Sequence, residues 1–158
     1  MTDVQKAWIL SWVVMAQELC PENWRVALAV AAHESNCGTS DLAVNHNNLF
    51  GIKAVPELVR AGAHRTATDG VHREFDEKED GFVEFNRMLT RSVYYPYVRE
   101  VERRDDVLEA RHRSKGDAAV VLMLYPNYCP MPSWVNLALD WLDGVWELTR
   151  DIRGPEDT

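Results

Sequence analysis

The segment from Trp24 to Ala32 most constrains the fold, because it is long enough for a helix and almost free of charge. Arg25 is its one charged residue, and alanine, valine and leucine supply most of the others. A helix that is apolar on nearly every side must be buried. Other helices therefore have to surround it. We predict that it begins at Pro21, a favourable first helical residue, and ends at about Ser35.

Two flanking segments have the apolar spacing of helices that cover a core. Thr2 and Gln5 form a capping-box pattern, so we predict a helix from there to about Leu19. Its inner face is predicted to consist of Trp8, Trp12, Met15 and Leu19. A closing helix is predicted from Ser133 to about Ile152. Its apolar stripe is predicted to consist of Trp134, Leu137, Trp141 and Val145.

Shorter elements are predicted between these helices. Further helical segments are expected over residues 40–44, 76–91, 97–104 and 117–124. Asp76 and Glu79 form a capping pair for the second of them. Residues 64–68 and 71–75 flank Asp69-Gly70, a dipeptide that suits the type I′ turn of a hairpin. One small hairpin among helices defines a mainly α (α+β) fold class.

Composition narrows the function classes. The chain has 158 residues, a size typical of one domain, and a net charge of −8, which argues against nucleic-acid binding. No apolar run is long enough for a membrane span, so we expect no membrane partner. Three cysteines give no disulfide framework, and we expect small buried thiols. We assign residues 1–152 to one domain and 153–158 to a flexible tail, and expect a monomer.

Glu34 is the candidate catalytic residue that its position alone singles out. It lies near the C-terminal end of the apolar helix, just before the chain becomes polar. Partial burial and the negative end of the helix dipole both disfavour the ionised form of a carboxyl group there. A carboxylic acid that keeps its proton is what protonation of a glycosidic oxygen requires. A solvated helix-end glutamate is the alternative interpretation.

The following loop, residues 45–53, has a composition that suits a sugar. It contains three asparagines, one aromatic residue and Gly51, which lets the backbone approach a ligand closely. Amides can bind the hydroxyls at the edge of a sugar ring, and an aromatic face can cover its C–H groups. Alternatively, the asparagines of such a loop satisfy local backbone groups.

Four blocks of sequence resemble the bacterial endo-β-N-acetylglucosaminidases of glycoside hydrolase family 73. The strong ones are Ala-Ala-His-Glu-Ser-Asn-Cys-Gly-Thr-Ser over residues 31–40 and Asn-Asn-Leu-Phe-Gly-Ile-Lys over residues 47–53. Weaker ones are Arg-Glu-Phe over residues 73–75 and Tyr-Cys-Pro-Met-Pro-Ser-Trp over residues 128–134. The resemblance implies a lysozyme-like helical domain with a small hairpin lobe. It also implies a hydrolase, without a cofactor or metal, that cleaves the β-1,4 bond between N-acetylglucosamine and N-acetylmuramic acid in peptidoglycan.

The resemblance also implies roles for individual residues. Glu34 matches the general acid, and Tyr128 is placed on the opposite side of the cleaved bond. The residues predicted to bind the sugar are Asn47, Asn48, Phe50 and Gly51. Asn36 and Cys37 replace the family's usual Gly and Trp, and Trp134 stands where the family usually has Tyr.

The second carboxylate of the reaction is not fixed by the sequence. The family often has a glutamate on the hairpin, and Thr66 occupies that position here. Asp69, Glu74 and Glu57 are acids nearby. We therefore predict that Glu34 acts either with Asp69 or with the N-acetyl group of the substrate itself. A lytic transglycosylase or a muramidase on the same fold is the alternative activity.

Two other classes of function compete with a glycosidase. His33-Glu34-x-x-Cys37 is a near match to a zinc-peptidase motif, with His46 as a third ligand. A non-catalytic peptidoglycan-binding protein is the other class, because a fold does not fix an activity. The sequence begins with acidic residues rather than a secretory signal. We therefore expect synthesis in the cytoplasm and action on the cell wall as a phage endolysin or a machine-delivered enzyme.

Overall fold

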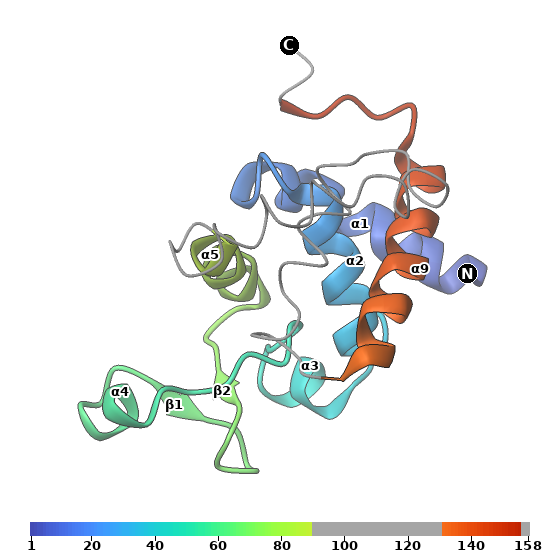
Figure 1. Ribbon diagram of the computed structural model, residues 1–158. Helices are drawn as coiled ribbons and strands as arrows, with labels where there is room; N and C mark the ends of the chain where they lie inside the picture. Colours follow the sequence, from blue (N-terminus) through green and yellow to red (C-terminus); the bar gives the residue numbers. More distant parts are fainter. Residues whose placement is uncertain (90–130, 156–158) are drawn as a thin grey trace.

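The computed structural model describes residues 1–89 and 131–155, and within them the protein is mostly helical with one small antiparallel sheet. The elements are α1 (Asp3–Leu19), α2 (Trp24–Ser35), α3 (Asp41–Asn45), α4 (Pro56–Arg60), β1 (Arg65–Thr66), β2 (Arg73–Glu74), α5 (Lys78–Leu89) and α9 (Pro132–Thr149). Figure 1 shows α2 between α9 and α5, with α4 and the hairpin projecting at the lower left. The predicted fold class is confirmed.

Helix α2 is the buried centre of the fold, as the sequence predicts. Ten of its twelve residues are buried. It packs most extensively against α9 and then against α1. Its four fully buried alanines are Ala27, Ala29, Ala31 and Ala32. Small side chains at these positions let neighbouring helix axes approach closely.

The start of α2 differs from the prediction. The helix begins at Trp24 rather than at Pro21, and Asn23 is its N-cap. The Asn23 N–H donates to the carbonyl of Cys20 at 3.0 Å, which closes a tight turn over the intervening residues. The chain has to reverse between two packed helices, and this turn uses the backbone groups that an earlier helix start would need.

The buried stripes of the two long outer helices also differ from the predicted ones. The buried residues of α1 are Ile9, Val13 and Ala16, one position along from the predicted Trp8, Trp12 and Met15. Both tryptophans are half-buried and pack at the side of the core, because small and branched residues fit the narrow space against α2. The buried residues of α9 include Trp134, Ala138, Leu142 and Val145, whereas Leu137 is 48% exposed.

Arg25, the one charge in the central segment, connects α2 to the end of α9. It is buried, and its guanidinium lies between the rings of Trp24 and Trp146, at 4.1 and 3.8 Å from their centroids. It donates to Thr149 Oγ1 at 3.1 Å and to the carbonyl of Ile152 at 3.0 Å. Hydrogen bonds and aromatic faces together replace the water that the charge loses on burial.

The hairpin forms, but its turn is not the predicted one. β1 and β2 pair with Arg65 opposite Glu74 and Thr66 opposite Arg73. A two-residue type I′ turn needs positive φ at both central residues, whereas of Asp69 and Gly70 only Gly70 has one, at 70°. The connection is a longer loop because Asp69 Oδ1 accepts from the N–H groups of Val71 and His72, at 2.8 and 2.9 Å.

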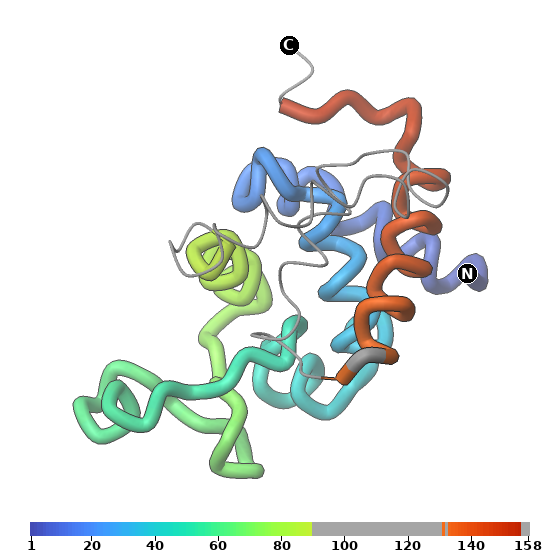
Figure 2. Tube along the Cα trace, in the orientation of Figure 1, coloured from blue at the N-terminus to red at the C-terminus, as the bar shows by residue number. Residues whose placement is uncertain are grey.

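The elements on either side of the hairpin complete the smaller lobe. Helix α4 was not predicted, although Pro56 at its first position is a sequence signal for a helix start. The predicted capping pair of α5 is shifted by one residue, because Glu77 N–H donates to Asp80 Oδ2 at 3.1 Å while Asp76 binds Arg65. Figure 2 shows this lobe leaving the helical body after α3 and returning to it at α5.

The remaining predictions about elements concern segments outside the described residues, namely the helices over 97–104 and 117–124.

Cys20 and Cys37 are buried free thiols, as expected, and burial raises the pKa of the Cys20 thiol to about 12. In the described ranges, no helix combines the length and the apolar character that crossing a bilayer requires.

Candidate active site

Glu34 lies in the last turn of α2, where the central helix reaches the smaller lobe, and its side chain is half-buried. Its Oε1 accepts a hydrogen bond from the indole Nε1–H of Trp134, at the start of α9. Trp134 is only 3% exposed, and its ring meets the edge of the His33 ring at a centroid distance of 6.3 Å. The indole therefore fixes one carboxylate oxygen in place.

Gly51 lies against the other oxygen of the same carboxylate. Its backbone has φ of +61°, and a Cβ built on it would lie 3.3 Å from Glu34 Oε2. Any larger residue would therefore crowd this oxygen and strain the backbone. Glycine at this position thus keeps its own side chain from occupying the place beside Oε2.

The segment after Glu34 turns sharply and is held by Ser35. Asn36, Cys37 and Gly38 all have left-handed backbones, with φ of 48°, 53° and 77°. Asparagine is the residue that tolerates this conformation best after glycine, which explains how Asn36 replaces the family's glycine. The buried Ser35 Oγ accepts from the Gly38 N–H at 2.8 Å and donates to the carbonyl of Ala31 at 2.5 Å.

Asn48, a predicted sugar ligand, is 1% exposed and bonded entirely to the backbone. Its Nδ2 donates to the carbonyls of Ile52 at 2.9 Å and Arg73 at 2.7 Å. Its Oδ1 accepts from the N–H groups of Phe50 at 3.3 Å and Ile52 at 3.0 Å. The Asn48 side chain thus connects its loop to strand β2.

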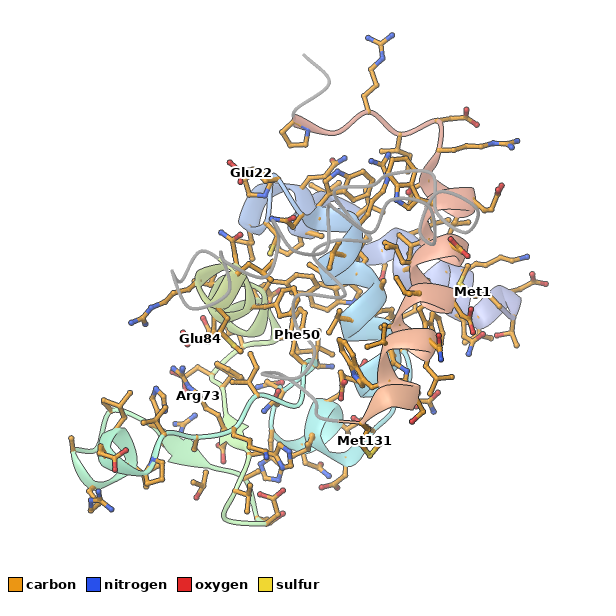
Figure 3. The ribbon with its side chains drawn as sticks, in the orientation of Figure 1. Met1, Glu22, Phe50, Arg73, Glu84 and Met131 are labelled. Atoms are coloured by element: carbon orange, nitrogen blue, oxygen red, sulfur yellow. The ribbon has the colours of Figure 1, made fainter. Side chains whose placement is uncertain are left out.

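Phe50 and Asn47, also predicted to bind the sugar, have structural partners as well. The fully buried Phe50 ring stacks on Phe85, with centroids 4.7 Å apart, and meets Phe82 edge-on. Figure 3 shows Phe50 within the helical body, near α5. Asn47 is half-buried with φ of 53°, and its Nδ2 donates to the carbonyl of Asp76 at 2.8 Å. Gly51, the fourth predicted sugar ligand, lies beside Glu34.

Asp69, the candidate second acid, lies in the exposed hairpin loop. Its Oδ2 is 2.6 Å from His72 Nδ1, and Oδ1 accepts the two loop N–H groups. The hydrogen bond with His72, aided by those two, holds the pKa of the Asp69 carboxyl well below its usual range. A carboxylate with so low a pKa is a weak base. Tyr128, the other predicted catalytic residue, lies outside the described residues.

A pocket of about 240 Å³ opens between the smaller lobe and α5, and Glu34 itself is not among its lining residues. Gly51, whose backbone borders Glu34 Oε2, is one of its lining residues. Its apolar lining consists of Ile52, Val55, Leu58 and Met88. Its charged and polar lining consists of Lys53, His64, Arg73, Glu84 and Arg87. Figure 3 shows Arg73 and Glu84 close together at the junction of the lobe and α5.

The zinc hypothesis needs His33 and Cys37 to share a helix face. The helix ends at Ser35, and Cys37 follows it in a left-handed backbone, so the i, i+4 geometry is lost. Among residues 1–89 and 131–155, no cluster of three histidine, cysteine or acidic side chains could hold a metal ion.

Trp134, which donates to Glu34, is not among the site residues that the sequence predicts. Tryptophans at helical spacing are normally core residues, and Trp134 is indeed buried. The sequence does contain one indication of this role. Trp134 ends a block in which the family usually has Tyr at the same position, and Trp and Tyr both carry a hydrogen-bond donor on an aromatic ring.

A helical body with one small hairpin lobe is the architecture of a lysozyme-like domain. Residues 13–136 match the family model Glucosaminidase, described as mannosyl-glycoprotein endo-beta-N-acetylglucosaminidase. The chain belongs to this family and is a glycoside hydrolase. No curated protein matches the chain.

Two solved structures share the fold at low sequence identity. The catalytic domain of the autolysin Auto from Listeria monocytogenes superposes with a TM-score of 0.62 and 20% identity, over 95% of this chain and 88% of that one. An N-acetylmuramoyl-L-alanine amidase structure from Staphylococcus aureus superposes with a TM-score of 0.64 and 17% identity, over 98% of this chain and 46% of that one.

Proposed function

We propose that this protein hydrolyses the β-1,4 bond between N-acetylglucosamine and N-acetylmuramic acid in peptidoglycan, with Glu34 as the general acid. The observation that carries the proposal is the placement of Glu34, held by Trp134 through one oxygen and bordered by Gly51 on the other. The glucosaminidase family match supports the bond, and the fold shared with an autolysin supports the substrate.

The two carboxylate oxygens have different tasks in this proposal. Oε1 is occupied by the indole N–H, so the side chain keeps one orientation. Oε2, on the Gly51 side, delivers its proton to the glycosidic oxygen as the C1–O bond breaks. Because the general acid acts only when its heavy atoms reach hydrogen-bond distance of the leaving oxygen, a fixed rotamer beside an open space is the required geometry.

The N-acetyl group of the substrate acts as the nucleophile in the proposed mechanism. Its carbonyl oxygen bonds to C1 while Glu34 protonates the leaving group. Water then attacks C1 and gives its proton to the Glu34 carboxylate, which restores the acid and the N-acetyl group. The structure of the hairpin loop supports this route over one through Asp69, whose carboxylate is bonded within its own loop and has a lowered pKa.

The test is mass spectrometry of reduced muropeptides that wild type and Glu34→Gln release from purified sacculi. We expect products that end in reduced N-acetylglucosamine from wild type, and at least a hundredfold less release by the variant, because general acid catalysis contributes about 10²–10⁴-fold. Reduced muramic-acid ends would instead assign a muramidase, and 1,6-anhydro ends a lytic transglycosylase. No release by wild type would favour a binding role.

We propose that the enzyme reaches the wall as a phage endolysin or as the cargo of a delivery machine. The net charge of −8 supports delivery close to the wall, because it gives no long-range attraction to an anionic polymer.

A further inference from the structure

His46 is a buried histidine that the proposed mechanism does not use. It is the C-cap residue of α3, five residues before Gly51, and it is 7% exposed. Its backbone carbonyl accepts from the Phe75 N–H at 3.0 Å. The residue therefore lies where the helical body meets the hairpin lobe, and a polar ring buried at such a place needs a structural or functional reason.

The His46 ring contacts the hairpin on both sides of its turn. Nε2 lies 3.5 Å from the backbone N of Thr68 and 3.3 Å from Thr68 Oγ1, in the loop after β1. Because an N–H group can only donate, Nε2 accepts and the proton of the neutral ring is on Nδ1. Nδ1 lies 3.4 Å from Glu74 Oε2, in β2. One side chain thus connects the body to both arms of the hairpin.

These contacts are longer than ideal hydrogen bonds. Nδ1 of His46 has no hydrogen-bond partner among the described residues, although it is buried. Glu74 is held from the side of β1, because its Oε1 lies 3.5 Å from Arg65 Nη2. An approach of about 0.5 Å would bring Oε2 of Glu74 within hydrogen-bond distance of Nδ1. Because a buried donor without an acceptor is costly, the ring favours the hairpin position that is closest to the body.

The stem of the same hairpin is fixed relative to Glu34 by other bonds. The Arg73 N–H donates to the Ile52 carbonyl at 2.8 Å, and Asn48 Nδ2 donates to the Arg73 carbonyl at 2.7 Å. Gly51, which precedes Ile52, lies beside Glu34 Oε2. The stem and the segment that borders Glu34 therefore form one unit.

The turn of the hairpin, residues 67–72, has a separate connection on each side. On one side the Val71 carbonyl accepts from the Ala54 N–H at 2.9 Å. On the other side Thr68 contacts the ring of His46. Loss of the His46 contact should therefore loosen one side of the turn and leave the stem in place.

We propose that His46 is a positioning residue for the proposed reaction. Through Thr68 and Glu74 it holds the hairpin turn against the helical body, so that the substrate meets a preformed lobe rather than a mobile one. The inference rests on the proposed function, because only a substrate at Glu34 gives the position of the turn a role in binding. His46 acts on binding and not on the chemical step, since its described contacts do not include Glu34.

The test combines enzyme kinetics on soluble glycan strands with amide hydrogen exchange of the free protein. Thr68→Val removes the hydroxyl group and keeps the shape of the side chain, and Thr68→Ser keeps the hydroxyl. His46→Phe keeps an aromatic ring and removes both nitrogens. His64→Phe is the matched control, because His64 Nδ1 accepts from the Val55 N–H at 3.2 Å, within the smaller lobe.

We expect Thr68→Val to raise KM about three- to tenfold, the size of effect that one net hydrogen bond gives. Its kcat should stay within about twofold, because a lobe that is placed correctly for only part of the time weakens apparent binding alone. His46→Phe should raise KM at least as much. The double variant should not exceed His46→Phe, because both changes remove the same contact.

Amides of residues 64–75 should exchange faster in Thr68→Val by a factor similar to the change in KM, whereas amides of α2 should keep their wild-type rates. Thr68→Ser should have the KM and the exchange rates of wild type. Thr68 is exposed, so its variants carry the test even if His46→Phe does not fold.

An unchanged KM in Thr68→Val would overturn the inference even if exchange became faster, because the contact would then be structural only. Equal effects in His64→Phe would overturn it too. Exchange needs no substrate, so unchanged exchange rates in Thr68→Val refute the His46 contact whether or not wild type cleaves sacculi. Failure of the proposed function is decided separately, by the products that wild type releases.

Discussion

Glu34 depends on residues that are distant in the sequence. Trp134 is 100 residues away, and Gly51 belongs to the loop that Asn48 fastens to the hairpin. The sequence alone singles out Glu34, because it shows both the carboxyl group and its place near the end of an apolar helix. The indole partner could not be found in this way, since no spacing rule links two residues on different helices.

Trp134→Phe tests whether the indole orients the proposed catalytic carboxylate, that of Glu34. The change keeps an aromatic ring and removes the N–H donor to Glu34 Oε1. We expect kcat to fall about 10- to 100-fold, because a small displacement of a reacting group costs this much. Steady-state kinetics on sacculi measure the effect. Trp141→Phe, in the same helix and half-buried, is the control; an equal loss there would show a general packing effect.

Gly51→Ala tests the space beside Oε2. The new methyl group would lie 3.3 Å from this oxygen, and the left-handed backbone costs about 1–2 kcal/mol for a residue with a Cβ. Gly62→Ala is the matched control, because φ is +74° and nothing lies within 4 Å of its Cβ. Both variants should lose similar thermal stability. Only Gly51→Ala should lose most of its activity, and equal activities would refute crowding at the site.

At the scale of elements, the sequence predicts which segments are helical better than how each one faces its neighbours. Trp8 and Trp12 have the same helical period as Ile9 and Val13, so periodicity alone cannot choose between the two stripes. The narrow space between α1 and α2 selects the stripe with the smaller side chains, Ile9 and Val13. The Asp-Gly turn fails for a similar reason, because bonds from Asp69 to later N–H groups override a dipeptide preference.

Asn48→Asp tests the connection between the loop and strand β2. The substitution replaces the Nδ2 donor by an oxygen that faces the carbonyls of Ile52 and Arg73. A buried carboxylate opposite two acceptors should lower the free energy of unfolding by about 3 kcal/mol or more. Urea denaturation followed by circular dichroism measures it. Asn45→Ala, which removes an exposed hydrogen bond to Asp41, should cost under about 1 kcal/mol.

At the scale of the whole molecule, the two lobes differ in how much of each is buried. α2 has ten buried residues, whereas α4 has none and the sheet has two-residue strands. The sequence predicts this contrast, because an apolar helix can only be central and a short polar hairpin can only be peripheral. It does not predict that the two lobes meet at Glu34, which depends on long-range packing.

Hydrogen exchange should reveal this difference directly. We expect amides of α2 to exchange only through global unfolding and amides of residues 56–72 to exchange through local opening, at rates faster by several orders of magnitude. Mass spectrometry of peptic fragments after deuterium labelling provides the measurement. Equal protection in the two lobes would contradict a peripheral, separately opening hairpin.

The bond between Glu34 and Trp134 has a consequence for synthesis of the protein. A ribosome delivers Glu34 early, but the indole that orients it only after α9 has been made. Until then α2 also lacks the helix against which it packs most. A nascent or prematurely terminated chain thus holds the acid without its partner. Under the proposed function, activity therefore requires the completed α9 and arrives late in translation.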